Sequence, residues 1–306
     1  MTAPDSPLDR PSKLLLIEDD RSQAATMEQM LELGEIGYEV VHVESLSAAR
    51  QFLHDHRAAC IVLDLTLPDA ARLDGLMEMK NLAPEVPVVV VTVDDDTTRG
   101  VKALQAGAQD YLVKGTLDSD QLCRSVRYAV ERGLSELRLA HRALHDALTG
   151  LPNRVLLIDR LDYALAESER AETSVAVYFL DLDGFKEVND RLGHLAGDAV
   201  LRGIAGRLLT WVRPGDTVCR YGGDEFTVLV RGVNSEREAV QIAGRLSEAV
   251  SRPLPVDGEE VSVTPSIGIA LGRGVRRPEE LIERADRAMY SAKRRSDTNH
   301  EISAER

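Results

Sequence analysis

The sequence predicts an α/β protein with two domains joined by a helical stalk. In the N-terminal half, short apolar runs alternate with helical patterns. An apolar seam without proline crosses the middle, and the C-terminal half mixes helical patterns with a strand hairpin. The 306 residues suffice for two domains of ordinary size. A hydrophobic fraction of 43% is sufficient for packed cores and argues against bulk disorder.

Composition excludes several classes of partner. The formal net charge of -14 argues against a nucleic-acid-binding surface, which is normally basic. The longest apolar run, 86–93, is too short to span a membrane. The cysteines, Cys60, Cys123 and Cys219, have neither zinc nor disulfide spacing. We therefore expect a reduced, cytoplasmic protein with no nucleic-acid or membrane partner, and a disordered polar tail over 1–11.

Five short apolar runs in the N-terminal half are the expected strands. Helical patterns separate them, for example around 24–31. This alternation predicts a doubly wound, five-stranded parallel sheet with helices on both faces. The runs are 13–17, 40–43, 60–63, 88–92 and 111–113.

Polar side chains follow four of these strands. Glu18 and Asp19 follow the first strand, Asp64 the third, Thr92 ends the fourth and Lys114 follows the fifth. Ligands of parallel sheets bind at the carboxyl ends of the strands. Three carboxylates close together favour a hard cation such as Mg²⁺, and Asp64 is the natural phosphoryl acceptor. The alternative is that each acid is only a helix N-cap or turn residue.

Residues 12–130 resemble a response-regulator receiver domain. The matching stretches are 15–20, 62–69, Thr92 and 110–114. The resemblance implies that Asp64 accepts phosphate from a cognate histidine kinase. It implies Mg²⁺ on Glu18, Asp19, Asp64 and the Thr66 carbonyl. It further implies a switch pair, Thr92 and Tyr111, and a phosphate contact at Lys114.

The connector from 119 to 145 lacks proline and carries apolar residues at spacings of mostly three and four. This pattern predicts a long helix with an apolar seam. One interpretation is an amphipathic helix on its own domain followed by a linker. The other is a homodimer-forming stalk, which we favour because the seam outruns the receiver core. The seam residues are Leu122, Val126, Ala129, Gly133, Leu137, Ala140 and Leu144.

The C-terminal half has an α+β order with an antiparallel element. Expected strands are 174–180, a hairpin formed by 217–219 and 226–230, and a strand pair around 261–270. Expected helices are one that carries Val188, Asn189 and Leu192 and is interrupted at 193–198, one running to 211, 238–251 and one from 278.

The hairpin tip carries Gly222, Gly223, Asp224 and Glu225. Two glycines supply positive φ and let a bulky anionic group approach the backbone. Carboxylates beside a nucleoside triphosphate require a divalent metal ion between them. Asp181 ends the 174–180 strand, so its carboxylate converges on the tip if the strands pair. That is a two-metal arrangement for nucleotidyl transfer; the alternative is an ordinary turn with solvated acids.

Three polar residues near Asp181 could complete such a site. Lys186 lies near a helix N-terminus, where a triphosphate is electrostatically favoured. Asn189 and Asp198 could contact the donors and acceptors of a guanine edge. Taken singly, Asp198 is more often a helix cap and Lys186 a solvated surface residue.

Residues from 146 to 300 resemble a GGDEF-domain diguanylate cyclase. The matching stretches are 146–154, 181–190, 193–198, 220–226 and 285–293. The resemblance implies a ferredoxin-like, nucleotidyl-cyclase-like fold. It also implies that a dimer condenses two GTP into cyclic di-GMP and two pyrophosphates.

The same resemblance implies residue roles. Mg²⁺, or Mn²⁺, would bind Asp181, the Leu182 carbonyl and Asp224. Asp224 would also be the general base, Glu225 would support the site and Lys186 would stabilise the transition state. The implied substrate-binding residues are Asn189, His194, Asp198, Gly222, Gly223 and Lys293.

Arg213 and Asp216, around Pro214-Gly215, match the family's RxxD inhibitory site for cyclic di-GMP. Arginine can hold a phosphate or a guanine edge with two hydrogen bonds. The alternative interpretation is a tight turn flanked by a surface ion pair.

Two positions depart from expectation. Asp297 stands where the family has arginine, and Arg294 or Arg295 could replace that cation. A carboxylate there would repel the triphosphate, which keeps open a catalytically weak domain acting as a cyclic di-GMP receptor. Pro265 lies within an expected strand and predicts an edge or a bulge.

Overall fold

A computed structural model of the chain describes residues 13–70, 73–93, 97–171, 173–294 and 300–303. The expected tail over 1–11 lies outside this range, as do Arg295 and Asp297. Contacts divide the chain into two compact units, Met1–Ala140 and His141–Arg306. Each unit is described by itself.

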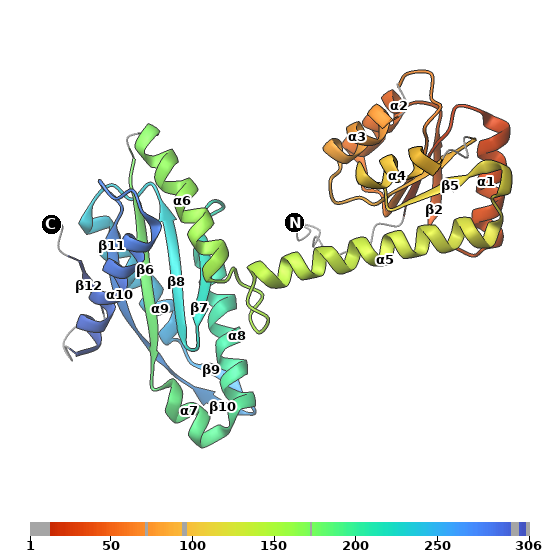
Figure 1. The fold of residues 1–306 in the computed structure, drawn as a ribbon. Helices are drawn as coiled ribbons and strands as arrows, with labels where there is room; N and C mark the ends of the chain where they lie inside the picture. The colour runs from red at the N-terminus through yellow and green to blue at the C-terminus, as the bar shows by residue number, and fades with distance from the viewer. Residues whose placement is uncertain (1–12, 71–72, 94–96, 172, 295–299, 304–306) are drawn as a thin grey trace. The chain divides into compact units, whose positions relative to one another are not determined.

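The first unit is a five-stranded parallel sheet, as predicted (Figure 1), and its strand order is β2-β1-β3-β4-β5. The buried side chains of α1 and α5 pack on one face, and those of α2, α3 and α4 pack on the other. β3 and β4 are buried along their whole length, which explains their continuous apolar runs. The elements are β1 (Lys13–Ile17), α1 (Arg21–Leu33), β2 (Glu39–Val43), α2 (Leu46–Asp55), β3 (Cys60–Asp64), α3 (Leu73–Leu82), β4 (Val88–Thr92), α4 (Thr97–Gln105), β5 (Asp110–Val113), the 3₁₀ turn η1 (Lys114–Thr116) and α5 (Ser119–Leu144).

The connector is one continuous helix, α5, as the proline-free pattern predicts. Its first part is buried against the receiver sheet from Leu122 to Gly133. Beyond Gly133 the seam is only partly covered: Leu137 is half-buried and Ala140 is exposed. The seam therefore outruns the receiver core, which keeps the dimer prediction open.

The second unit has a five-stranded sheet in the order β12-β11-β6-β8-β7. β6 runs antiparallel to both of its neighbours. Side chains of α7, α8 and α9 pack on one face, and those of α6 and α10 on the other. The elements are α6 (Arg154–Ala171), β6 (Val175–Asp183), α7 (Phe185–Leu192), α8 (His194–Trp211), β7 (Thr217–Gly222), β8 (Glu225–Arg231), α9 (Glu236–Ser251), β9 (Leu254–Val256), β10 (Glu259–Val261), β11 (Thr264–Leu271), α10 (Pro278–Arg294) and β12 (His300–Ile302).

The expected strand pair around 261–270 is wrong in its pairing. β10 pairs with β9 in a separate two-stranded sheet, whereas β11 pairs with β6 and β12. The physical reason is the tight turn at Asp257 and Gly258, whose φ angles of 49° and 87° close a hairpin with the preceding segment.

Pro265 lies in an edge part of β11, one of the two predicted situations. It faces Leu182 of β6 in an unshifted register, so β11 has no bulge there. On the other side, β12 pairs only with Ile267, Gly268 and Ile269. A residue without an N–H donor is tolerated in such a position.

The described helices include none that combines the length and apolar character needed to cross a membrane.

Candidate functional site

Three carboxylates gather at the carboxyl ends of β1 and β3. Glu18, Asp19 and Asp64 each place an oxygen within 4.8 Å of the others. The side chains of Glu18 and Asp64 are 0% and 1% exposed. The helix-cap alternative applies instead to Asp20, which accepts a 2.8 Å hydrogen bond from the Ser22 amide.

Lys114 bridges two of these acids. Its Nζ lies 2.6 Å from Glu18 Oε2 and 2.9 Å from Asp64 Oδ2, and its side chain is 11% exposed. Burial raises the pKa of Glu18; the Lys114 hydrogen bond opposes the shift and the Asp64 charge adds to it. The ammonium group of Lys114 therefore lies against the acids Glu18 and Asp64, as the sequence predicts.

Thr66 donates two hydrogen bonds to Asp64, 3.0 Å from its amide and 2.7 Å from its hydroxyl. Thr92 is buried at the end of β4. Tyr111, on neighbouring β5, packs its ring against Gly100 of α4. The clustered carboxylate oxygens are the hard donor set that Mg²⁺ prefers, so these residues fit the predicted ion.

In the second unit, pairing of β6 with β8 brings the predicted acids together. The register places Asp181 opposite Glu225, and Asp224 is the preceding residue, in the turn. Gly223 has φ of 51°, which favours glycine, and a register shift between Arg220 and Gly222 bends β7. The strand pairing on which the predicted convergence depends is therefore present, and the convergence of the carboxylates stays a prediction.

Lys293 reaches this acidic site from α10. Its Nζ lies 2.5 Å from Asp181 Oδ1, and this hydrogen bond raises the pKa of Lys293, with the charges of Asp183 and Asp224 adding to the shift.

Burial, then the charges of Asp181, Asp286 and Asp224, raise the pKa of Glu225. Asp183 accepts 3.0 Å hydrogen bonds from Ser266, yet burial still raises its pKa. Carboxylate and carbonyl oxygens are the donor types that Mg²⁺ or Mn²⁺ prefers, and the metal role of Asp181, Leu182 and Asp224 stays a prediction.

The predicted guanosine residues lie around the junction of α7 and α8. A Cβ at Gly197 would overlap Asn189 Oδ1, so glycine lets the two helices approach there. Asp198 lies in the second turn of α8, 3.9 Å from Arg202, and is not a cap. His194, the first residue of α8, is exposed, as is Lys186 in the first turn of α7.

The 146–154 segment contacts the hairpin through two side-chain pairs that were not predicted from the sequence. Asp146 accepts hydrogen bonds of 3.0 and 3.1 Å from Arg220, whose other nitrogens donate to the Gly223 carbonyl. Arg154 lies 5.0 Å above the Tyr221 ring. Burial alone would raise the pKa of Asp146, but hydrogen bonds from Thr149 and Arg220 hold it below its ordinary value.

The predicted RxxD segment is a tight turn. Gly215 has φ of 100°, and the Asp216 carboxylate accepts from the amides of Arg213 and Arg231, at 3.0 and 3.1 Å. Arg213 is exposed and borders, with Asp216, a cavity of about 80 Å³. The surface ion pair of the alternative interpretation is replaced by these amide contacts, and the inhibitory role stays a prediction.

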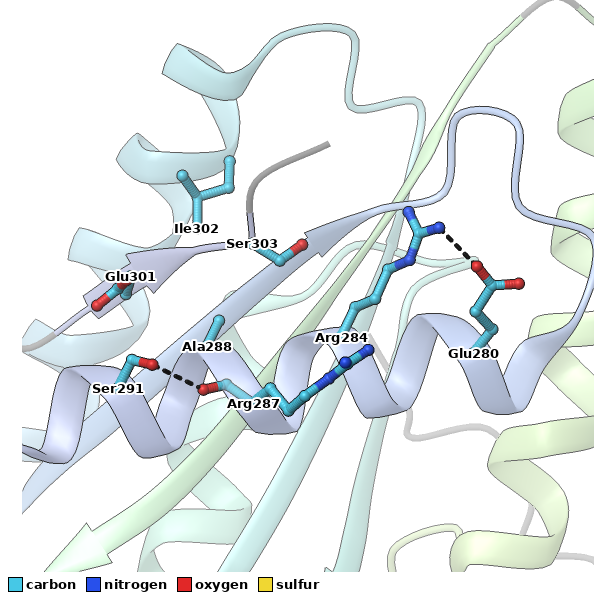
Figure 2. A pocket seen from close by; sticks show the side chains of 8 residues that line it. All are labelled: Glu280, Arg284, Arg287, Ala288, Ser291, Glu301, Ile302 and Ser303. Atoms are coloured by element: carbon cyan, nitrogen blue, oxygen red, sulfur yellow. Dashed lines mark hydrogen bonds and ion pairs between the residues drawn. The ribbon is translucent and has the colours of Figure 1, made fainter. Parts of the chain in front are cut away.

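A larger cavity of about 480 Å³ lies between α10 and β12 (Figure 2). Glu280 and Arg284 point toward one another at its rim, 2.5 Å apart, and Arg287 lies one turn further along α10. No predicted site residue lines it.

Comparison with known protein families finds one family for each half of the chain. The family described as "Diguanylate cyclase, GGDEF domain" matches residues 143–299, and the family described as "Response regulator receiver domain" matches residues 14–127. The chain belongs to the GGDEF-domain diguanylate cyclase family and carries a receiver domain ahead of that domain.

Individual relatives match different shares of the chain. Response regulator PleD of Caulobacter vibrioides is 34% identical over 236 residues, covering 74% of this chain and 52% of that protein. Diguanylate cyclase TpbB of Pseudomonas aeruginosa is 46% identical over 160 residues, covering 52% and 37%. The chain thus spans about half or less of the length of these relatives.

Two solved structures resemble the second unit. The GGDEF domain of TpbB from Pseudomonas aeruginosa is 42% identical with a TM-score of 0.50, covering 52% of this chain and 94% of that one. The coiled coil and GGDEF domain of DgcB from Caulobacter crescentus, solved in complex with c-di-GMP, is 31% identical with a TM-score of 0.53, covering 61% and 98%.

Proposed function

We propose that this protein is a phosphorylation-regulated diguanylate cyclase. It condenses two GTP into cyclic di-GMP and two pyrophosphates. One observation supports the proposal: the pairing of β6 with β8 sets Asp181 opposite Glu225, with Asp224 in the adjoining turn, and Lys293 is hydrogen-bonded to Asp181. Family membership supports the substrate and the product.

The chain's own residues provide the binding groups. Asp181, the Leu182 carbonyl and Asp224 would hold Mg²⁺ or Mn²⁺, which supplies charge neutralisation for the triphosphate. Gly222 and Gly223 leave the hairpin backbone open to an anionic group. Lys186, at the start of α7, and Lys293 would neutralise phosphate charge. Asn189, His194 and Asp198 would hold the guanosine part.

The reaction needs two copies of the domain because each GTP supplies both a nucleophile and an electrophile. A 3′-oxygen of one GTP forms a bond to the α-phosphorus of the other, and the bond to pyrophosphate breaks. Asp224 would take the 3′-hydroxyl proton, and Glu225 would support it. The same step in the opposite direction closes the ring. A homodimer with facing domains brings the two nucleotides together.

Control would begin at Asp64. Phosphate transferred from a histidine kinase would place new negative charge beside Lys114, with Mg²⁺ held by Glu18, Asp19, Asp64 and the Thr66 carbonyl. Thr92 and Tyr111 would rearrange together. The helix α5, whose C-terminal part is the stalk, would transmit this rearrangement of the receiver onward. Its partly covered seam beyond Gly133 supports a stalk that pairs in the homodimer.

Cyclic di-GMP would inhibit the enzyme by binding Arg213 and Asp216. The exposure of Arg213 supports this proposal, because its guanidinium can contact a phosphate or a guanine edge.

The test is incubation of the purified chain with GTP and Mg²⁺, followed by chromatography of the nucleotides. Cyclic di-GMP and pyrophosphate in a 1:2 ratio are expected. No product from well-folded protein, together with tight binding of added cyclic di-GMP, would instead establish the receptor function.

A further inference from the structure

Ser266 of β11 is a buried serine across the sheet from the acid Asp181. It is 5% exposed, and the register of β11 with β6 sets it directly opposite Asp181. Directly opposed residues of an antiparallel pair place their side chains on the same face of the sheet. The serine hydroxyl therefore lies on the face that carries the acids, although the proposed nucleotidyl transfer gives this residue no role.

The hydroxyl of Ser266 donates to Asp183, the last residue of β6. Its Oγ lies 3.0 Å from each carboxylate oxygen of Asp183. Asp183 is two residues after Asp181 on the same strand, so both carboxylates lie on one face of the sheet. A serine hydroxyl has a single hydrogen to donate, so its donation to Asp183 leaves the oxygens of Asp181 available to a cation.

The ammonium group of Lys293 interacts with both of these acids. Its Nζ donates to Asp181 Oδ1 at 2.5 Å. Burial raises the pKa of Asp183, and the Ser266 hydrogen bond and the Lys293 charge oppose this rise, so the ammonium group is close enough to attract the second carboxylate. Two carboxylates therefore hold the ammonium group, and one of them is itself tied to β11.

We propose that Ser266 is a positioning residue for GTP binding. It holds Asp183 in one place, and the fixed carboxylate keeps the ammonium group of Lys293 where it can contact the triphosphate. The Lys293 side chain is 45% exposed, so without such a contact a ligand would have to order a flexible side chain. Holding the side chain beforehand reduces that cost of binding. The inference rests on the proposed cyclase function and adds a residue to its substrate site.

The test is calorimetric titration of a non-hydrolysable GTP analogue, with Mg²⁺, into the full chain. Ser266→Ala should weaken binding by about fivefold, the effect of leaving one flexible side chain to be ordered by the ligand. Ser266→Cys, which keeps a similar volume but only a weak donor, is the second variant and should show the same loss. Ser174→Ala is the matched control. Ser174 is also 5% exposed and lies just before the other end of β6, so binding should be unchanged.

A double-mutant cycle separates positioning of Lys293 from a general effect on the fold. In Lys293→Ala there is no ammonium group to position, so the further change Ser266→Ala should not weaken binding again. Initial rates of cyclic di-GMP formation provide a second readout, in which Ser266→Ala should raise the KM for GTP more than it lowers kcat. Circular dichroism establishes that each variant is folded.

Two results would overturn the inference alone. One is binding of wild-type strength by the folded Ser266 variants, and the other is an equal further loss when Ser266→Ala is added to Lys293→Ala. Either result would leave the hydrogen bond to Asp183 as a contact between strands only. A wild-type protein that does not bind the GTP analogue would overturn the proposed function together with this inference, so the two failures are distinguishable.

Discussion

The two carboxylate sites of this protein use the same components in opposite environments. Each gathers acids at strand ends and adds a lysine from a distant segment: Lys114 in the receiver and Lys293 in the cyclase domain. The Lys114 side chain is 11% exposed, whereas that of Lys293 is 45% exposed. The lysine of the receiver site is therefore largely shielded from water, whereas the lysine of the second site is half-exposed.

This difference in exposure indicates whether each lysine contributes mainly to folding stability or mainly to ligand binding. Charges in a closed site are desolvated, so removing one partner leaves the others uncompensated and destabilises the fold. Charges in an open site are screened by water, so their loss affects ligand binding more than folding. Four substitutions test this difference between the two sites.

The largest effect is expected for Asp224→Asn. Asp224 lies in the hairpin turn, so the fold should be retained while turnover falls by about 10²–10³-fold, as for loss of one preorganised catalytic group. Initial rates of pyrophosphate release measure the change. Asp257→Asn, in the turn between β9 and β10, is the matched control and should keep wild-type rates. Normal turnover by the Asp224 variant would refute the site assignment.

Lys114→Ala should destabilise the receiver by about 3 kcal/mol in the absence of Mg²⁺, because Glu18 and Asp64 lose their cation while buried. Added Mg²⁺ should restore part of the loss. Urea unfolding followed by circular dichroism gives the free energy. Lys102→Ala, an exposed lysine on α4, should change it little. Equal stability of the two variants would contradict the closed-site description.

Asp146→Asn should lower the stability of the cyclase domain by about 2 kcal/mol at neutral pH, since it removes charge-assisted hydrogen bonds from Arg220 and Thr149. The folded-state pKa of Asp146 is below 3.8, so the ionised form contributes stability above pH 3.8. That contribution disappears as the pH falls through the lowered pKa.

Urea midpoints of the wild type and the Asp146 variant, measured against pH, should therefore converge on acidification. Asp162→Asn, an exposed acid on α6, is the control. A difference that is independent of pH would show that the Asp146 charge is not responsible.

The smallest effect is expected for Lys293→Ala. Its hydrogen bond to Asp181 is half-exposed, so the KM for GTP should rise by about tenfold with little change in unfolding free energy. Arg287→Ala, on an exposed face of the same helix, is the control. A stability loss as large as that of Lys114→Ala would remove the distinction between the two sites.

Much of this arrangement could be predicted from the sequence. β1, β3 and β4 are continuous apolar runs followed or ended by polar residues, and a parallel sheet necessarily brings such ends to one edge. The hairpin glycines likewise indicated the turn that presents Asp224. An apolar run or a pair of turn glycines therefore predicts both the type of an element and its place in the chain.

Long-range pairings were less accessible. β9 and β12 have three residues each, too short for a periodic pattern, and the pairing of β10 was wrong because the Asp257-Gly258 turn was not recognised. The Asp146–Arg220 contact joins residues 74 positions apart in the chain. Nothing in the sequence next to either residue indicates its partner. Lys293 was assigned through family resemblance, and only the structure shows that it reaches Asp181.

Control of cyclase activity through Asp64 is tested most directly by the rate of cyclic di-GMP formation with and without a small-molecule phosphodonor, in the wild type and in Asp64→Asn. We expect the phosphodonor to raise the wild-type rate and to leave the rate of the variant unchanged. A wild-type rate that is independent of phosphodonor, or an equal rise in the variant, would contradict control through Asp64.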